Sequence, residues 1–191
     1  EMKQDIILSG VGGQGILSIA FVIDNAALKE GMEFKQAEIH GMAQRGGAVQ
    51  SHLRLSDKPI FSDLVPRGKA DMILSVEPLE SLRYIDYLSP DGIIVASNNP
   101  YMNIGDYPDL DTVLNRIRAV KNSVIIDSEK LAREAGSRKA QNMVVLGAAS
   151  KHLILKKETL EEFIRVLFMS RSESLADMNV RAFRLGYNAT S

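Results

Sequence analysis

Three glycines near the start of the chain have the spacing of a phosphate-binding turn. Gly10, Gly12 and Gly15 fit the pattern G-x-G-x-x-G, and Gly13 and Gln14 complete the same turn. An apolar strand pattern precedes the turn and a helical pattern follows it, which is the context that this motif requires. A helix N-terminus offers unpaired N–H groups and a partial positive charge, and glycines let that backbone approach a phosphate. The turn therefore indicates phosphate or dinucleotide binding, and the alternative is only a tight, well-packed βα turn.

A second polar loop presents an arginine with little steric cover. Arg45 is followed by Gly46 and Gly47, and His40 and Gln44 precede it. A guanidinium can bind a carboxylate or a phosphate through two parallel hydrogen bonds. We favour a functional loop over the alternative, a flexible turn with a solvated arginine. Because the carboxyl ends of strands form the binding crevice of an open α/β sheet, we expect this loop to lie beside the glycine-rich turn.

A nucleotide-dependent dehydrogenase would need an acidic residue at the end of its second strand to bind the ribose. Glu38 lies at about the right distance, but Ile39 and His40 follow it rather than a clean strand end. The chain also has no obvious Tyr-x-x-x-Lys or His/Asp catalytic pair. His52 stands on the polar face of an alternating strand, so we expect a surface histidine rather than a catalytic base. The dehydrogenase is kept as an alternative.

The composition suits one globular domain, residues 1–191, with a sizeable core. Apolar residues make up 45% of the chain and charged residues 25%, which is ordinary for a soluble protein. Lys and Arg number 23 and Asp and Glu number 24, so the net charge of −1 gives no reason to expect nucleic acid or a membrane as a partner. Because no membrane span or signal peptide pattern is found, we expect a cytoplasmic location.

The chain contains no cysteine. Disulfides, zinc–thiolate sites and iron–sulfur clusters held by this chain are therefore excluded. The three histidines, His40, His52 and His152, are widely spaced and follow no metal-binding pattern. We expect no metal site in this chain.

Alternating strand and helix patterns predict an α/β fold. A helix from about residue 15 to a stop at Gly31 carries apolar side chains around most of its circumference, so we expect it to be largely buried. Further strands are expected over 32–39, 48–55, 71–76, 93–96 and 124–126. Further helices are expected from 78, over 110–119, 128–135 and 138–155, after a capping box at Thr159 and Glu162, and over 172–185 before a stop at Gly186. This order predicts a three-layer α/β/α sandwich with a mostly parallel sheet, a Rossmann-like start and a helical C-terminal part, in which strand 48–55 could run antiparallel.

Three passages together resemble a known family. They are Gly-Val-Gly-Gly-Gln-Gly-Ile at 10–16, His-Gly-Met-Ala-Gln-Arg-Gly-Gly-Ala-Val at 40–49, and Gly-Lys-Ala-Asp-Met-Ile-Leu-Ser-Val-Glu-Pro-Leu-Glu at 68–80. They resemble the gamma-type domain of 2-oxoacid:ferredoxin oxidoreductases, over about residues 3–150 and the tail 179–186. The passages at 40–47 and 77–80 are most similar to the beta subunits of indolepyruvate:ferredoxin oxidoreductases.

The resemblance implies a complex that decarboxylates an aryl pyruvate, transfers the acyl group to coenzyme A and reduces ferredoxin. In that family thiamine diphosphate, its Mg²⁺ ion and the iron–sulfur clusters belong to the larger partner subunit. The missing cysteines, and the absence of a Gly-Asp-Gly…Asn element for thiamine diphosphate, agree with this division. We therefore expect no catalytic residue here and no activity of this chain alone. The glycine-rich turn and the Arg45 loop could hold coenzyme A phosphates, face the partner's cofactor or form the subunit contact, and a non-catalytic scaffold is the remaining alternative.

Apolar residues in predicted loops indicate an interaction face. Stable hetero-complexes bury large and relatively apolar areas, so one face should carry side chains that look misplaced on a monomer. The candidates are Met42, Phe61, Leu64, Val65, Tyr101 and Met102.

Overall fold

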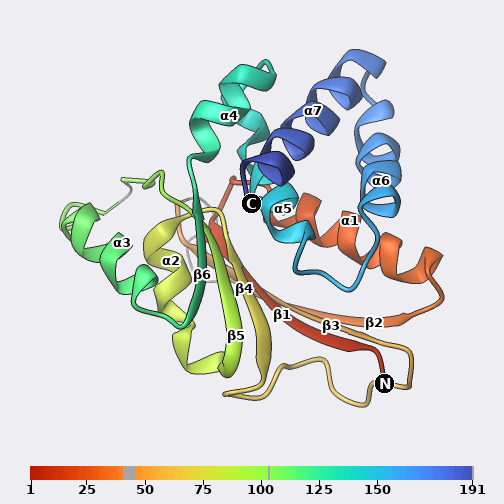
Figure 1. The fold of residues 1–191 in the computed structure, drawn as a ribbon, viewed down its shortest axis with the longest axis horizontal. Coiled ribbons are helices and arrows are strands. Elements are labelled where there is room, and N and C mark those ends of the chain that lie inside the picture. Colours follow the sequence, from red (N-terminus) through yellow and green to blue (C-terminus); the bar gives the residue numbers. More distant parts are fainter. Residues whose placement is uncertain (41–45, 103, 191) are drawn as a thin grey trace.

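The computed structural model describes residues 1–40, 46–102 and 104–190. Its centre is a six-stranded sheet in the order β2-β3-β1-β4-β5-β6 (Figure 1). The strands are β1 (Lys3–Val11), β2 (Glu33–His40), β3 (Ala48–Ser56), β4 (Ala70–Ser75), β5 (Leu88–Ser97) and β6 (Asn122–Ile126).

The sheet is mixed. Strands β1, β4, β5 and β6 are parallel, whereas β3 pairs antiparallel with both β1 and β2. The expected antiparallel strand is thus confirmed. In a dinucleotide-binding fold the second strand of the chain pairs directly with the first. Here β3 lies between them, so the likeness to that fold ends after the first helix.

In the part of the chain that the structure describes, seven α-helices surround the sheet. They are α1 (Ile16–Lys29), α2 (Pro78–Arg83), α3 (Leu110–Arg118), α4 (Ser128–Ala135), α5 (Gln141–Ser150), α6 (Lys157–Met169) and α7 (Glu173–Ala189). Helices α2 and α3 cover one face, and α1 and α5 lie directly on the other with α4, α6 and α7 packed further out (Figure 1). The predicted three-layer α/β/α class and the helical C-terminal part are confirmed. None of the described helices is both long enough and apolar enough to cross a membrane.

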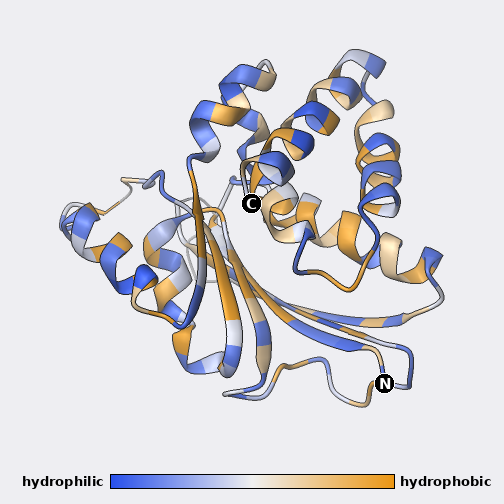
Figure 2. Ribbon diagram, in the orientation of Figure 1, coloured by the Kyte–Doolittle hydropathy of each residue, from blue (hydrophilic) through white to orange (hydrophobic). Residues whose placement is uncertain are grey.

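Strand alternation divides the apolar residues between two cores. In β1, Ile6 and Leu8 join the larger core beneath α1 and α5, while Ile7 joins the smaller core beneath α2 and α3. The parallel strands are apolar on both faces, as expected for strands covered by helices on both sides (Figure 2). Helix α5 is apolar around its circumference because it lies between the sheet and α7, and every residue from Asn142 to Ser150 is buried.

Helix α1 is buried over most of its residues, as expected, but not around most of its circumference. Eight of its residues are buried, but Leu17, Phe21 and Leu28 remain exposed along one stripe. Asp24 has the spacing of the same stripe but is buried, with only 5% of its surface exposed. The periodic pattern identified the helix correctly, but it did not distinguish the side facing the sheet from the side facing solvent.

Two of the predicted helix boundaries near the C-terminus are wrong. The expected helix 138–155 is a 3₁₀ turn, Arg138–Ala140, followed by α5, and His152 lies in the turn after it. The expected capping box fails because α6 begins at Lys157, which places Thr159 inside the helix.

Gly186 does not end the last helix, because α7 continues to Ala189. Gly186 instead lies at the point where α7 crosses α5. A Cβ atom on Gly186 would lie 1.9 Å from the carbonyl oxygen of Val144, and one on Gly147 would lie 1.9 Å from that of Phe183. The two glycines therefore let α5 and α7 approach backbone to backbone.

His52 is buried, not a surface histidine, with 1% of its surface exposed. The connection between β3 and β4, here called the 57–69 strap, folds across the polar side of β3. Its Val65 N–H donates to Nδ1 of His52 at 3.0 Å, and Arg54 forms an ion pair with buried Asp5 at 2.9 Å while donating to strap carbonyls. Burial lowers the pKa of His52.

The predicted apolar loop residues do not form one face. Val65 is buried, because its side chain points from the strap into the smaller core, so that candidate is wrong. Phe61 and Leu64 are exposed on the strap, which enters β4 at its amino end, whereas Tyr101 and Met102 are exposed beyond the carboxyl end of β5. Met42 lies outside the described residues.

Candidate functional site

The glycine-rich turn and the end of the second loop meet at one end of the sheet, as expected. Gly12 N donates to Gly47 O at 2.9 Å, next to the pairing of Val11 with Ala48. Gly46 has a φ of 74°, in the left-handed region. Gln44 and Arg45, together with the His40 side chain, lie outside the description that the structure gives.

Three residues of the glycine-rich turn have structural roles, in closing the turn or in its packing against neighbouring side chains. The Gln14 side-chain oxygen accepts from Val11 N at 2.8 Å, which closes the turn. A Cβ atom on Gly10 would lie 2.8 Å from Ile16, and one on Gly15 would lie 2.3 Å from the amide nitrogen of Asn142. Packing thus accounts for Gly10 and Gly15. Gly13 and Gly15 both have a left-handed φ, of 96° and 81°, but a Cβ atom on Gly13 would face open space.

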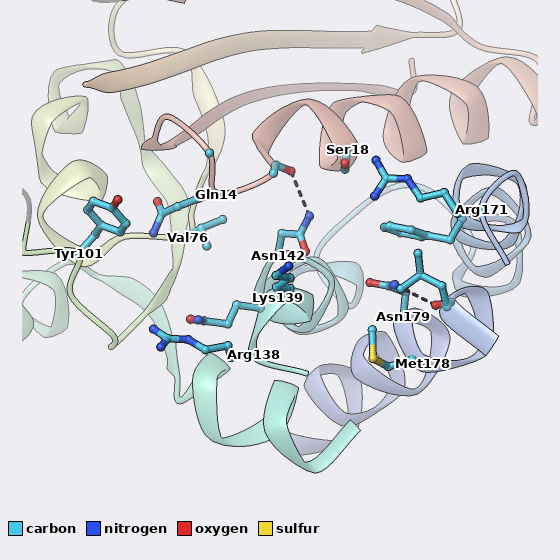
Figure 3. A pocket seen from close by; sticks show the side chains of 15 residues that line it. Gln14, Ser18, Val76, Tyr101, Arg138, Lys139, Asn142, Arg171, Met178 and Asn179 are labelled. Carbon is cyan, nitrogen blue, oxygen red and sulfur yellow. Dashed lines mark hydrogen bonds between the residues drawn. The ribbon is translucent and has the colours of Figure 1, made fainter. Parts of the chain in front are cut away.

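A cavity of about 510 Å³ opens beside this turn (Figure 3). Its walls come from the start of α1, the start of α5, the α6–α7 turn and the segments after β4 and β5. Among the predicted site residues that the structure describes, Gly13, Gln14 and Gly15 line it. The other lining residues are Ser18, Val76, Tyr101, Arg138, Lys139, Gln141, Asn142, Phe168, Arg171, Leu175, Met178 and Asn179.

The cavity has a positive character. Arg138, Lys139 and Arg171 line it, and no Asp or Glu is found among its described lining residues. Arg138 makes only a long contact of 3.9 Å with Glu129, and within the described chain Lys139 and Arg171 form no ion pair. The N-terminus of α1 adds its partial positive charge, since no side chain caps it and its first turn holds no acid. An anion is the ligand that this arrangement favours.

One wall of the cavity is apolar. Its apolar lining residues include Phe168, Leu175 and Met178, and Figure 3 shows Met178 on the side of Arg171, away from Tyr101. The Asn142 side chain donates to Gly15 O at 3.2 Å, and this hydrogen bond connects α5 to the start of α1. A cavity with cations and an apolar wall can hold a molecule that carries phosphates on one part and a flat apolar group on another.

Most of the cavity-lining residues were missed by sequence reasoning. The residues from α5, α6 and α7 belong to a part of the chain for which the sequence pattern predicts helices but no binding site. One signal was available: Arg138 and Lys139 open a helical pattern, although cations are unfavourable at a helix N-terminus. Arg171 carried no such signal, because nothing in the spacing shows that the α6–α7 turn folds back onto α1.

The comparisons define the class of protein. Residues 5–189 match the family described as "Pyruvate ferredoxin/flavodoxin oxidoreductase". The match covers nearly the whole chain, and the chain belongs to this family.

Individual members of the family are similar to this chain over nearly its whole length. The "Indolepyruvate oxidoreductase subunit IorB" of Thermococcus kodakarensis is 39% identical over 98% of this chain and 96% of the relative. The fold matches the pyruvate oxidoreductase subunit PORC of Thermotoga maritima with a TM-score of 0.76 at 23% identity, covering 98% of this chain and 97% of that one. It also matches 32% of a longer chain, the 2-oxoglutarate:ferredoxin oxidoreductase of Magnetococcus marinus, with a TM-score of 0.78 at 22% identity over all of this chain. The resemblance inferred from the three sequence passages is thus confirmed.

Proposed function

We propose that this chain is the small subunit of an indolepyruvate:ferredoxin oxidoreductase. The observation that carries the proposal is the 39% identity to a subunit named for indolepyruvate over nearly the full length of both chains. The complex would oxidatively decarboxylate an aryl pyruvate, form its coenzyme A thioester and reduce ferredoxin.

In this proposal a larger partner subunit carries out the decarboxylation and the electron transfer. Iron–sulfur clusters need thiolates, and this sequence has no cysteine. Thiamine diphosphate needs a Mg²⁺ site, and the described residues contain no group of three potential metal ligands. We therefore place both groups in the partner subunit, and no step through them is assigned to this chain.

We assign the cavity beside the glycine-rich turn to coenzyme A. Its phosphates suit Arg138, Lys139, Arg171 and the N–H groups at the start of α1, because charge-assisted hydrogen bonds are about twice as strong as neutral ones. The adenine suits the wall of Phe168, Leu175 and Met178. In this role the chain binds and orients the acyl acceptor, while the partner carries out decarboxylation and electron transfer.

Reconstitution tests the proposal. Reduction of a viologen dye with indolepyruvate and coenzyme A is measured for this chain alone, for the large subunit alone and for the two together. We expect turnover only from the pair, and faster turnover with indolepyruvate than with pyruvate. Turnover by this chain alone, or an equal rate with the large subunit alone, would contradict the proposal.

A further inference from the structure

A buried carboxylate fixes the loop that leaves β5. Glu77 has 1% of its surface exposed, and in the described part of the chain no Lys or Arg forms an ion pair with it. One carboxylate oxygen accepts from Glu80 N at 2.8 Å and caps α2. The other accepts from Tyr101 N at 3.3 Å and from the Tyr107 hydroxyl at 2.5 Å. Because an unpaired buried charge is costly, these bonds must satisfy it, and they hold the loop at two points.

The start of the same loop is fixed as well. The Asn99 side-chain oxygen accepts from Glu129 N at 2.8 Å, and Asn99 N donates to buried Ser97 at 3.0 Å. The amide nitrogen of Asn99 donates to Asp127 at 3.3 Å. The loop is therefore anchored to β5, to the start of α4 and to the start of α2.

Between these anchors the loop exposes apolar side chains. Met102 is 65% exposed, and Tyr101 and Ile104 are also exposed. We call these three residues the apolar tip. The fixed ends keep the tip from collapsing onto the domain, so its exposure is a consequence of the fold. Tyr101 also lines the cavity, at the end opposite Arg171 (Figure 3), so the tip continues directly into the cavity mouth.

We propose that the apolar tip docks into an apolar socket on the large subunit, which places the cavity mouth at the subunit interface. The inference rests on the proposed function and adds the surface through which the subunits join. Rigid apolar and aromatic anchors are typical of binding hot spots, because little conformational entropy is lost when they are buried.

The charge of the cavity argues against a second copy as the occupant. Two copies joined through their tips would bring Arg138 and Lys139, the cavity cations on the side of Tyr101 (Figure 3), toward those of the other copy, and like charges across an interface are unfavourable. A partner that presents acidic groups, or that encloses the anionic ligand, suits both the tip and the cavity.

The test measures assembly of the purified chain with its large subunit by sedimentation at fixed salt. Met102→Asp places a charge in the tip, and Ile104→Asp is a second variant on its other side. The matched control is Phe61→Asp, because Phe61 is 96% exposed at the opposite end of the sheet. We expect the tip variants to weaken assembly tenfold or more and the control to stay within twofold, with unchanged thermal unfolding of all three.

Each alternative outcome identifies which idea fails. Wild-type affinity of both tip variants, or loss of assembly in Phe61→Asp alone, would overturn the docking surface while leaving the proposed function standing. A self-dimer of the isolated chain that Met102→Asp disperses would overturn the choice of occupant. Failure of the wild-type chain to bind the large subunit would overturn the proposed function as well.

Discussion

Asp24 is an ionisable side chain buried among the apolar residues of α1. Its carboxyl group is buried in α1, and one of its oxygens has no hydrogen-bond partner among the described atoms. Burial, assisted by the nearby charge of Glu38, raises the pKa of Asp24 to about 7 from its ordinary value of 3.8. The protonated form of Asp24 therefore dominates in the folded chain below about pH 7, since transfer of a charge from water costs more than transfer of a neutral acid.

The first prediction at this scale is a stability that falls as pH rises. Between the unfolded pKa of 3.8 and the folded pKa of about 7, the unfolded chain binds fewer protons than the folded chain. Each pH unit in this window lowers the free energy of unfolding, so the Asp24 contribution should fall by roughly 2–3 kcal/mol from pH 5 to pH 8. Urea unfolding of wild type and Asp24→Asn at both values measures it.

The difference between the two unfolding curves isolates Asp24 from the other titrating groups. Asp24→Asn should lack this part of the pH dependence, whereas the control Asp63→Asn, at an exposed strap residue, should keep it. Parallel curves for wild type and Asp24→Asn would mean that Asp24 is ionised like an ordinary surface acid.

The sequence located part of the candidate site at the residue scale. It identified Gly13, Gln14 and Gly15, because their spacing follows from the geometry of a turn into a helix, which is local. It also predicted Arg45, whose role stays a prediction because it lies outside the described residues. The spacing of the turn does not reveal the three cavity cations, since they approach α1 through tertiary packing; only the position of Arg138 and Lys139 at the start of a helical pattern gave a signal.

At the scale of elements, the β1–turn–α1 unit and the alternating β3 were predictable because local periodicity decides them. The helix ends near the C-terminus were not. A glycine ends a helix in many sequences, but Gly186 is needed where α5 and α7 cross. A sequence pattern alone does not separate a glycine that a cap requires from one that a neighbouring helix requires.

That distinction gives the element-scale prediction. Gly186→Ala would gain about 1 kcal/mol of helix propensity but would place a methyl group 1.9 Å from the Val144 carbonyl oxygen. Backbone atoms cannot rotate away as a side chain can, so the overlap should outweigh the gain and lower the free energy of unfolding by about 1–3 kcal/mol or more. Thermal unfolding measures this loss. Gly105→Ala, where no atom lies within 4 Å of the added Cβ, is the control and should change stability little. A more stable Gly186→Ala variant would show that α5 and α7 do not approach backbone to backbone at Gly186.

At the scale of the whole molecule, the cavity joins distant parts of the chain. Its walls come from the start of α1, from residues 138–142 and from residues 168–179, so a bound ligand would contact segments that are far apart in the sequence. A ligand that binds only the folded state stabilises the whole fold by RT ln(1 + [L]/Kd), which is about 2.7 kcal/mol at a hundredfold excess over Kd.

Coenzyme A should therefore raise the unfolding temperature of the isolated chain in a concentration-dependent way. For a domain of this size, stabilisation of about 2.7 kcal/mol corresponds to a rise of roughly 5–10 °C.

Arg171→Ala removes a cation that has no ion-pair partner in the described chain, so the unliganded variant should unfold at nearly the same temperature as wild type. Loss of one charge-assisted contact of about 1.5–3 kcal/mol should weaken coenzyme A binding tenfold or more. Arg165→Ala, which removes a surface ion pair with Asp177 outside the cavity, is the matched control and should keep wild-type affinity. An equal coenzyme A-dependent shift in all three proteins, or no shift in wild type, would show that the cavity does not hold coenzyme A, because a ligand seated among these cations must respond to the loss of one of them.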